Sequence, residues 1–311
     1  MKSAHKESIG IQLLSIAGGL LGSMFFIGFL FMTIFDAPKA MGVLGVILMI
    51  AVLIVDRTSK SRVLDGACIG TSVAALIMVG VGLETSTHSD NATALALLAI
   101  SILMPLVTRG YMLNLIAVLV FNGALFALIY TNHVFILIHL FVPLLAAAYT
   151  YTSLYRFRIW RNGFLLSFIV LLGYLGMTEM DRPGYNGNDW ISSVLIIAVV
   201  VFILQRIISH LHIETQRSKI QIYAMTLLLM LLSVFAPAIC GGLLILLLSF
   251  HTGHRVGLIT GFLALLYFVS LYYYNMHFSL LIKSGIMVAT GMLFLTAWFI
   301  FKNTLKRYEQ N

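Results

Sequence analysis

Two ionisable side chains stand inside strongly apolar stretches of the sequence, and they are the first candidates for chemistry. His139 and Lys283 each lie about six residues inside the predicted outer end of an apolar segment, where an ionisable group is costly unless it faces a cavity, pairs or snorkels. Tyr130 and the Tyr272–Tyr274 run bring hydroxyls and ring faces close in sequence. We therefore predict a polar site of Lys283, His139, Tyr274 and Tyr130 that receives anionic groups from outside. The alternative is that Lys283 snorkels to the headgroups and His139 bonds a neighbouring carbonyl.

Asp65 and Glu84 flank one apolar segment, with a carboxylate near each end. Such a pair could serve a proton relay, but both positions are close enough to water for simple solvation. They are weaker site candidates. Two small-xxx-small spacings, Gly66/Gly70 and Gly257/Gly261, allow close approach of helices and predict packing seams.

Histidines recur at two further places, as His210-x-His212 and His251-x-x-His254. Imidazole is a common metal ligand, but no cysteine or carboxylate spacing completes either site. The sequence also lacks a phosphate-binding glycine loop, an H-E-x-x-H helix and a G-x-S-x-G turn. We therefore expect no metal, no cofactor and no enzymatic activity.

The segments that carry these residues are too apolar for a soluble domain. Hydrophobic residues make up 60% of the chain and charged residues 10%, with a mean hydropathy of +1.02. Since the apolar runs are continuous rather than alternating, we predict an all-α integral membrane protein. The candidate spans are 11–35, 40–55, 64–84, 92–107, 111–130, 133–155, 163–179, 190–209, 221–236, 238–250, 256–274 and 278–301. The loops between them leave no room for a soluble domain.

Charge sets the predicted orientation. The net charge is +8, and all 19 Lys and Arg residues except Lys39, Arg182 and Lys283 fall on one side if the chain has twelve spans. The positive-inside rule then places both termini in the cytoplasm. It also favours a hairpin at Pro237 rather than one long helix, because a fused helix would put Arg255 outside. We attribute the net positive charge to the cytoplasmic excess of Lys and Arg, and we expect no nucleic-acid partner.

The sequence carries a weak internal repeat. Asp36-Ala-Pro38 ends the first span and Asp181-Arg-Pro183 ends the seventh, an offset of 145. The offset of 144 relates Tyr130 to Tyr274 and His139 to Lys283. We predict a 6+6 parallel tandem repeat with halves 1–155 and 156–311. The alternative is coincidence, since apolar helices share Leu and Ile by chance.

The carboxyl end resembles a known bacterial family. The run Tyr272-Tyr273-Tyr274…Leu280-Leu281-Ile282-Lys283-Ser284-Gly285, after Pro237 and Arg255, is similar to the end of the multi-spanning domain of unknown function 4401, over roughly the last 80 residues. The resemblance implies a bacterial inner (plasma) membrane and neighbouring membrane partners. It implies no particular biochemical activity.

Two functions remain open from the sequence. The first is a non-catalytic membrane subunit or scaffold that packs against other integral membrane proteins through its glycine seams and tyrosine cluster. The second is a transporter or flippase-like carrier of a small or lipidic, anionic substrate. Convergence of His139, Lys283, Asn114, Asn122 and Glu84 on one cavity would favour the carrier. Membrane lipid is an expected partner in both cases.

Overall fold

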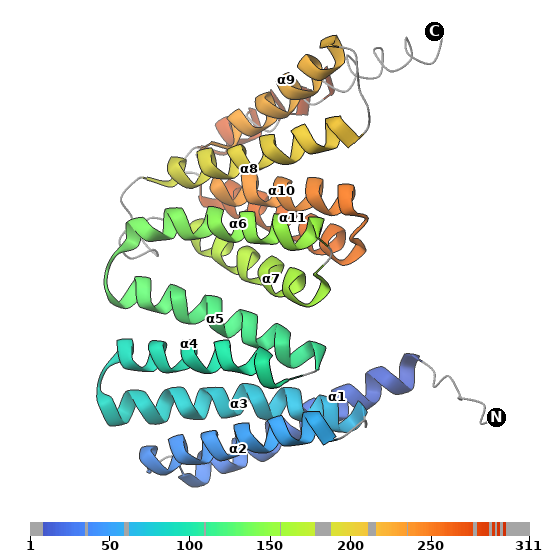
Figure 1. Cartoon of the computed structure of the whole chain (residues 1–311). Coiled ribbons are helices and arrows are strands. Elements are labelled where there is room, and N and C mark those ends of the chain that lie inside the picture. The colour runs from blue at the N-terminus through green and yellow to red at the C-terminus, as the bar shows by residue number, and fades with distance from the viewer. Residues whose placement is uncertain are drawn as a thin grey trace, which may run out of the picture. The chain divides into compact units, whose positions relative to one another are not determined.

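The computed structural model of the chain (Figure 1) describes residues 9–34, 37–58, 62–108, 110–155, 157–177, 188–210, 216–234, 236–275, 279–285, 288–289, 291–292 and 295–296. The regular elements of these residues are helices. They are α1 (Ile9–Ile34), α2 (Pro38–Thr58), α3 (Arg62–Thr87), α4 (Asp90–Val107), α5 (Tyr111–Thr131), the short 3-10 helix η1 (Phe135–Leu137), α6 (Ile138–Leu154), α7 (Arg158–Leu175), α8 (Asp189–His210), α9 (Gln216–Leu232), α10 (Pro237–Thr252) and α11 (Arg255–Asn275). Residues 280–285 are helical as well.

Several of these helices have the length and composition that cross a bilayer. Among the described residues, seven stretches qualify: Lys39–Thr58, Gly66–Thr87, Asp90–Val107, Tyr111–Thr131, Phe135–Leu154, Asp189–Ser209 and Arg255–Asn275. Shorter apolar stretches lie in α1, α7 and α10. The chain is therefore an α-helical membrane-embedded protein, as predicted. The count of twelve spans and the orientation of the termini stay predictions.

Local sequence explains where the helices begin and end. Ser89 caps α4, with its hydroxyl accepting a hydrogen bond from the Ala92 amide at 3.3 Å. Pro237 stands in the first turn of α10, where its missing N–H and fixed φ are tolerated. The predicted break at this proline is present, since α9 ends at Leu232 and α10 begins at Pro237.

The chain forms two compact units. Unit 1 comprises residues 1–141 and 151–167, and unit 2 comprises residues 142–150 and 168–311. α6 and α7 each contribute residues to both units. The predicted division into halves 1–155 and 156–311, and the repeat behind it, remain predictions.

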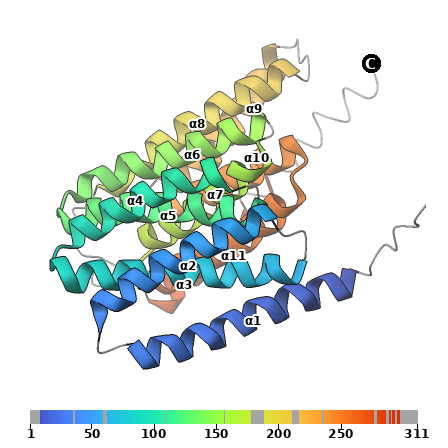
Figure 2. The ribbon, with the colours of Figure 1, turned by 60° about the horizontal axis from the view of Figure 1, so that its bottom comes forward.

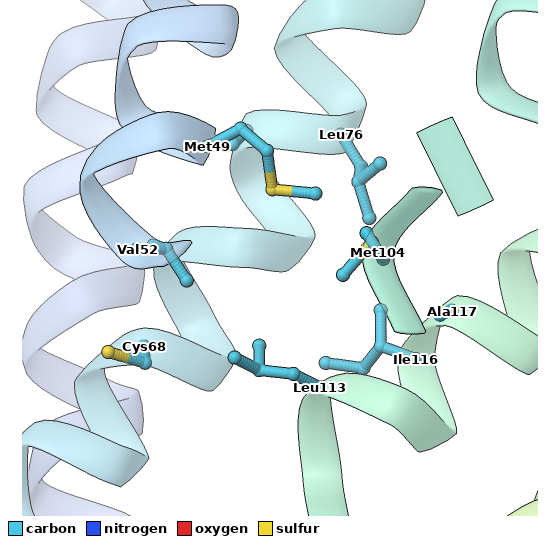
Figure 3. Close-up of a cluster of buried hydrophobic side chains, with 9 residues drawn as sticks. Met49, Val52, Cys68, Leu76, Met104, Leu113, Ile116 and Ala117 are labelled. Atoms are coloured by element: carbon cyan, nitrogen blue, oxygen red, sulfur yellow. The ribbon is translucent and has the colours of Figure 1, made fainter. Parts of the chain in front are cut away.

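The core of unit 1 lies where α2, α3, α4 and α5 meet (Figure 3). Met49 and Val52 from α2, Leu76 from α3 and Met104 from α4 are buried there, together with Leu113, Ile116 and Ala117 of α5. α1 packs along α3 (Figure 2). This apolar centre fixes the helices whose ends carry the polar groups described below.

The core of unit 2 is built around α10, which packs against α8 and α11. Glycines allow the close approach: a Cβ on Gly261 would lie 2.7 Å from Ile245 Cγ2, and one on Gly242 would lie 2.9 Å from Leu265 Cδ1. Gly257 and Gly261 thus form a seam against α10, as the small-xxx-small spacing predicts.

Candidate functional site

The two principal predicted residues lie in different units. His139 is the second residue of α6 and belongs to unit 1, where its side chain is 8% exposed. Lys283 follows α11 in unit 2 and is half-buried. Their convergence on one site is therefore still a prediction.

The side chain of Lys283 contacts the end of α11. Its Nζ donates to the backbone carbonyl of Tyr274 at 3.4 Å and lies 5.2 Å from the centre of the Tyr273 ring. The Tyr274 ring is 78% exposed and meets the Tyr273 ring edge-on. The cation thus contacts the face of Tyr273 and the backbone of Tyr274, whereas the sequence singled out the side chain of Tyr274.

Tyr130 lies in an aromatic turn rather than in a cavity wall. Its ring packs edge-on against Phe135 at a centroid distance of 5.9 Å and is tilted against Phe126 at 6.2 Å. The ring of His133, at a positive φ of 55°, is tilted against the Phe135 ring. These contacts brace the turn between α5 and η1, and they use the Tyr130 ring for packing.

The relay between the two carboxylate candidates, Asp65 and Glu84, stays a prediction. Glu84 is exposed near the end of α3, where its backbone carbonyl accepts a hydrogen bond from the His88 amide at 2.8 Å. Asp65 lies in α3, but its side chain is outside the described residues. Exposure of Glu84 agrees with simple solvation.

Asn114 and Asn122 are buried in α5 and hydrogen-bonded to nearby helices and turns. The amide nitrogen of Asn114 donates to the Gly110 carbonyl at 2.9 Å, and its oxygen accepts from the Thr108 hydroxyl at 3.2 Å. Asn122 reaches Ser167 of α7 at 3.1 Å. Both amides therefore serve helix packing.

Three polar side chains at the other end of α4 and α5 join these helices, and sequence reasoning missed them. Asn91 at the start of α4 accepts from the Thr131 hydroxyl at 2.7 Å and from the Asn132 amide at 2.9 Å. It also donates to the Asn132 oxygen at 3.1 Å. The spacing of about forty residues between partners gave no local signal.

Asp56 and Arg57 at the end of α2 bind the turn between α4 and α5. Arg57 Nε donates to the Val107 carbonyl at 2.9 Å, and the Gly110 amide donates to Asp56 Oδ2 at 3.3 Å. From the sequence, Arg57 counted only among the basic residues of one side, and Asp56 had no predicted role. A side chain on Gly110 would collide with the Asp56 carboxylate, so glycine is needed for this approach.

A buried polar cluster in unit 2 brings together Tyr149, Ser249 and His254. The Tyr149 hydroxyl and Ser249 Oγ are 2.9 Å apart, and both side chains are fully buried. Gly253, at a φ of 66°, ends α10 in a left-handed turn that lets the His254 amide donate to the Ser249 carbonyl at 2.9 Å. This turn places the His254 ring beside Ser249.

Gly257 lies directly against this cluster. A Cβ there would be 2.6 Å from His254 Nδ1 and 3.0 Å from the Tyr149 hydroxyl, and it would also overlap Ser249 Oγ. Serine next to histidine suggests a nucleophile and its base. Ser249 is 0% exposed, however, so a substrate carbonyl has no access to it in this arrangement. The cluster fits a hydrogen-bonded packing contact better than a catalytic centre.

A groove of about 340 Å³ opens on unit 1 between α2, α3 and α4. Lys39 and Ser86 lie at one end, and Gly42 and Gly82 form part of the wall. The remaining lining residues are apolar: Val43, Val46, Val79, Leu83 and Ile100. Sequence analysis placed Lys39 in an outer loop and gave it no role.

No group of three His, Cys, Asp or Glu side chains that could hold a metal occurs among the residues that the structure describes. His251 and His254 lie within them, whereas His212 is outside them.

Comparison with known proteins places the chain in a family. The model of the family called Domain of unknown function (DUF4401) matches residues 9–304. The chain belongs to the DUF4401 family. The resemblance seen in the last part of the sequence thus extends over nearly the whole chain. Searches of curated proteins and of solved structures gave no match.

Membership of the DUF4401 family adds no activity to the geometry, so the site residues must be judged on their own contacts. In this DUF4401 chain the buried Asn122 and Tyr149 bond to side chains of other helices, and the Lys39 groove combines a charge with an open apolar wall. These two features carry the proposals that follow.

Proposed function

We propose that this DUF4401 chain is a non-catalytic subunit of the bacterial inner membrane that works with other integral membrane proteins. In this proposal the chain crosses the membrane twelve times, as a 6+6 repeat, with both termini in the cytoplasm. The basic segments at the ends of α2 and α6 then face the cytoplasm, in keeping with the positive-inside rule.

The observation that supports the subunit is how the intramembrane polar side chains are used. A substrate path needs polar groups that face a shared, water-filled space. Asn122 bonds to Ser167, Asn114 bonds to Thr108, and Tyr149 bonds to Ser249. Each of these pairs joins or braces helices, and Glu84 lies exposed at the end of α3. This pattern is typical of a packed helical scaffold.

The contact surface that we assign to a partner is the tyrosine cluster at the end of α11. Tyr272 and Tyr274 are 42% and 78% exposed, and tyrosine is enriched at protein interfaces. The Gly257/Gly261 seam is occupied by α10 within unit 2, so it is not available to a partner. Gly66 and Gly70 of the other predicted seam are buried as well. The tyrosines are therefore the expected interface.

Photocrosslinking in native membranes tests this assignment. Benzoylphenylalanine at position 274 should form a specific, stoichiometric adduct with another integral membrane protein, identified by mass spectrometry after gentle extraction into lipid discs. The matched control is position 259 on the same helix, where Ile259 is 63% exposed. No protein adduct at position 274, or the same adducts at both positions, would overturn the subunit proposal.

A lipid carrier is the second candidate, and the groove beside Lys39 is the feature that favours it. An apolar hollow with a cation at its end suits an anionic, lipidic substrate. Purified chain in vesicles should then move a labelled anionic lipid between leaflets faster than protein-free vesicles do. A rate equal to that of empty vesicles would remove this candidate.

A further inference from the structure

The groove of unit 1 owes its shape to two facing glycines. A Cβ on Gly42 of α2 would lie 3.3 Å from the Cα of Gly82 of α3, so the two backbones nearly touch. Without side chains at these positions, the space between Val43, Val79 and Leu83 stays open. The volume of about 340 Å³ is within the range of small-molecule sites.

The residues that line the groove change from polar at one end to apolar farther along the helix axis. Lys39 is the first residue of the apolar stretch Lys39–Thr58, and Ser86 is next to the end of Gly66–Thr87. Both therefore lie at the level where the hydrocarbon gives way to headgroups. Val46 is farther along α2 by about 10 Å, at 1.5 Å per residue.

We propose that this groove binds one phospholipid with a net negative headgroup. The phosphate lies beside Lys39, and one acyl chain runs along Val43, Val46 and Val79. The proposal goes beyond the subunit function, because lipid binding at the groove needs no protein partner.

Charge and surface chemistry select this occupant. Lys39 is exposed at the mouth and, among the residues that the structure describes, is the only charged one lining the groove, while Glu84 and Asp90 lie near the same helix ends without lining it. A soluble anion would gain Lys39 but leave the apolar wall uncovered. An acyl chain covers that wall, and a cation at headgroup level attracts anionic lipid by about 1 kcal/mol, or roughly fivefold.

The test uses the full-length chain in phosphatidylcholine vesicles that contain a minor fraction of phosphatidylglycerol with a photoactivatable acyl chain. Labelling should map to Val43, Val46 or Val79. Lys39→Gln should lower the yield about fivefold, since it removes the headgroup cation, and Lys39→Arg should preserve it. Lys283→Gln is the matched control and should leave the yield unchanged, because its cation is held by Tyr273 and Tyr274.

A second pair of variants tests the acyl site itself. Val46→Phe fills the groove and should lower labelling, whereas Ile47→Phe, at a 55% exposed neighbour that does not line it, should not. Equal labelling by a phosphatidylcholine probe, equal yields for Lys39→Gln and wild type, or equal effects of the two phenylalanine variants would each overturn the proposal. So would labelling that is lost in native membranes because a protein segment occupies the groove.

Discussion

Asn122 and Ser167 join α5 to α7 within unit 1. The amide nitrogen of Asn122 donates to Ser167 Oγ at 3.1 Å and to the Val118 carbonyl at 2.9 Å. One turn before Ser167, a Cβ on Gly163 would lie 2.7 Å from Val118, so the helices meet closely at this level. The polar pair therefore sits inside a packed seam, with Asn122 2% and Ser167 4% exposed.

Removing this pair should destabilise the fold modestly. Asn122→Ala should lower the free energy of unfolding by about 0.6 to 2 kcal/mol, and a double-mutant cycle with Ser167→Ala should give a coupling of about 0.6 kcal/mol, because polar pairs between membrane helices are weak. Reversible unfolding in mixed micelles measures both values. A coupling energy of zero would mean that Asn122 and Ser167 do not interact in the folded protein.

Gly257 gives a sharper expectation for unit 2. Gly257→Ala pushes a methyl group into the Tyr149, Ser249 and His254 cluster and should cost about 1 to 3 kcal/mol by overpacking. Thermal unfolding of the detergent-solubilised protein measures the loss.

The matched control for that substitution is Gly173→Ala in α7, because a Cβ at Gly173 meets nothing within 4 Å. It should be neutral or slightly stabilising, since alanine favours helix over glycine by about 1 kcal/mol. Equal losses for the two variants would show that the cluster does not restrict Gly257.

Much of this could be predicted from residue patterns along the chain. Continuous apolar runs gave the helices and their membrane character, and Pro237 gave the break between α9 and α10, because helix formation and proline geometry are local. The Gly257/Gly261 spacing gave a packing seam, since helical periodicity puts both on one face.

The polar contacts were less accessible from sequence. Asn91 with Thr131, Arg57 with Val107 and Tyr149 with Ser249 join residues far apart in the chain, and one sequence alone carries no signal for such pairs. Lys39 was overlooked for another reason. The groove beside it arises because glycines on two different helices face each other. Two glycines far apart in the chain form no sequence pattern that predicts a groove.

The hydrogen bond from Arg57 to the turn between α4 and α5 predicts a local change in dynamics. Arg57→Gln removes a hydrogen bond to the Val107 carbonyl and should increase amide hydrogen exchange in residues 108–111, with little effect on global stability because Arg57 is exposed. Lys60→Gln, the same charge change in the same basic segment, is the control. Unchanged amide exchange in Arg57→Gln would show that the turn keeps its structure without the Arg57 hydrogen bond.

The twelve-span topology predicts the side from which single cysteines react. In a background with Cys68→Ala and Cys240→Ala, cysteines at Asn132 and Val234 should react with an impermeant maleimide from outside, and one at Thr252 only from the cytoplasmic side. Reaction of the Thr252 position from outside would contradict the hairpin at Pro237, because a single fused helix would carry Thr252 and Arg255 to the outer side.

Substitution of Lys283 distinguishes a local structural role of this side chain from a role in substrate binding. Its ammonium contacts the Tyr273 ring and the Tyr274 carbonyl at the end of α11, so Lys283→Met should lower the free energy of unfolding by less than about 1 kcal/mol. Lys283→Met and Tyr273→Leu should be non-additive, because each removes the same contact. The same Lys283→Met chain, reconstituted in vesicles, should keep any lipid movement that the wild type shows. Loss of lipid movement with unchanged stability would instead assign Lys283 to a substrate path. A cation that only contacts the end of α11 has no effect on a distant lipid.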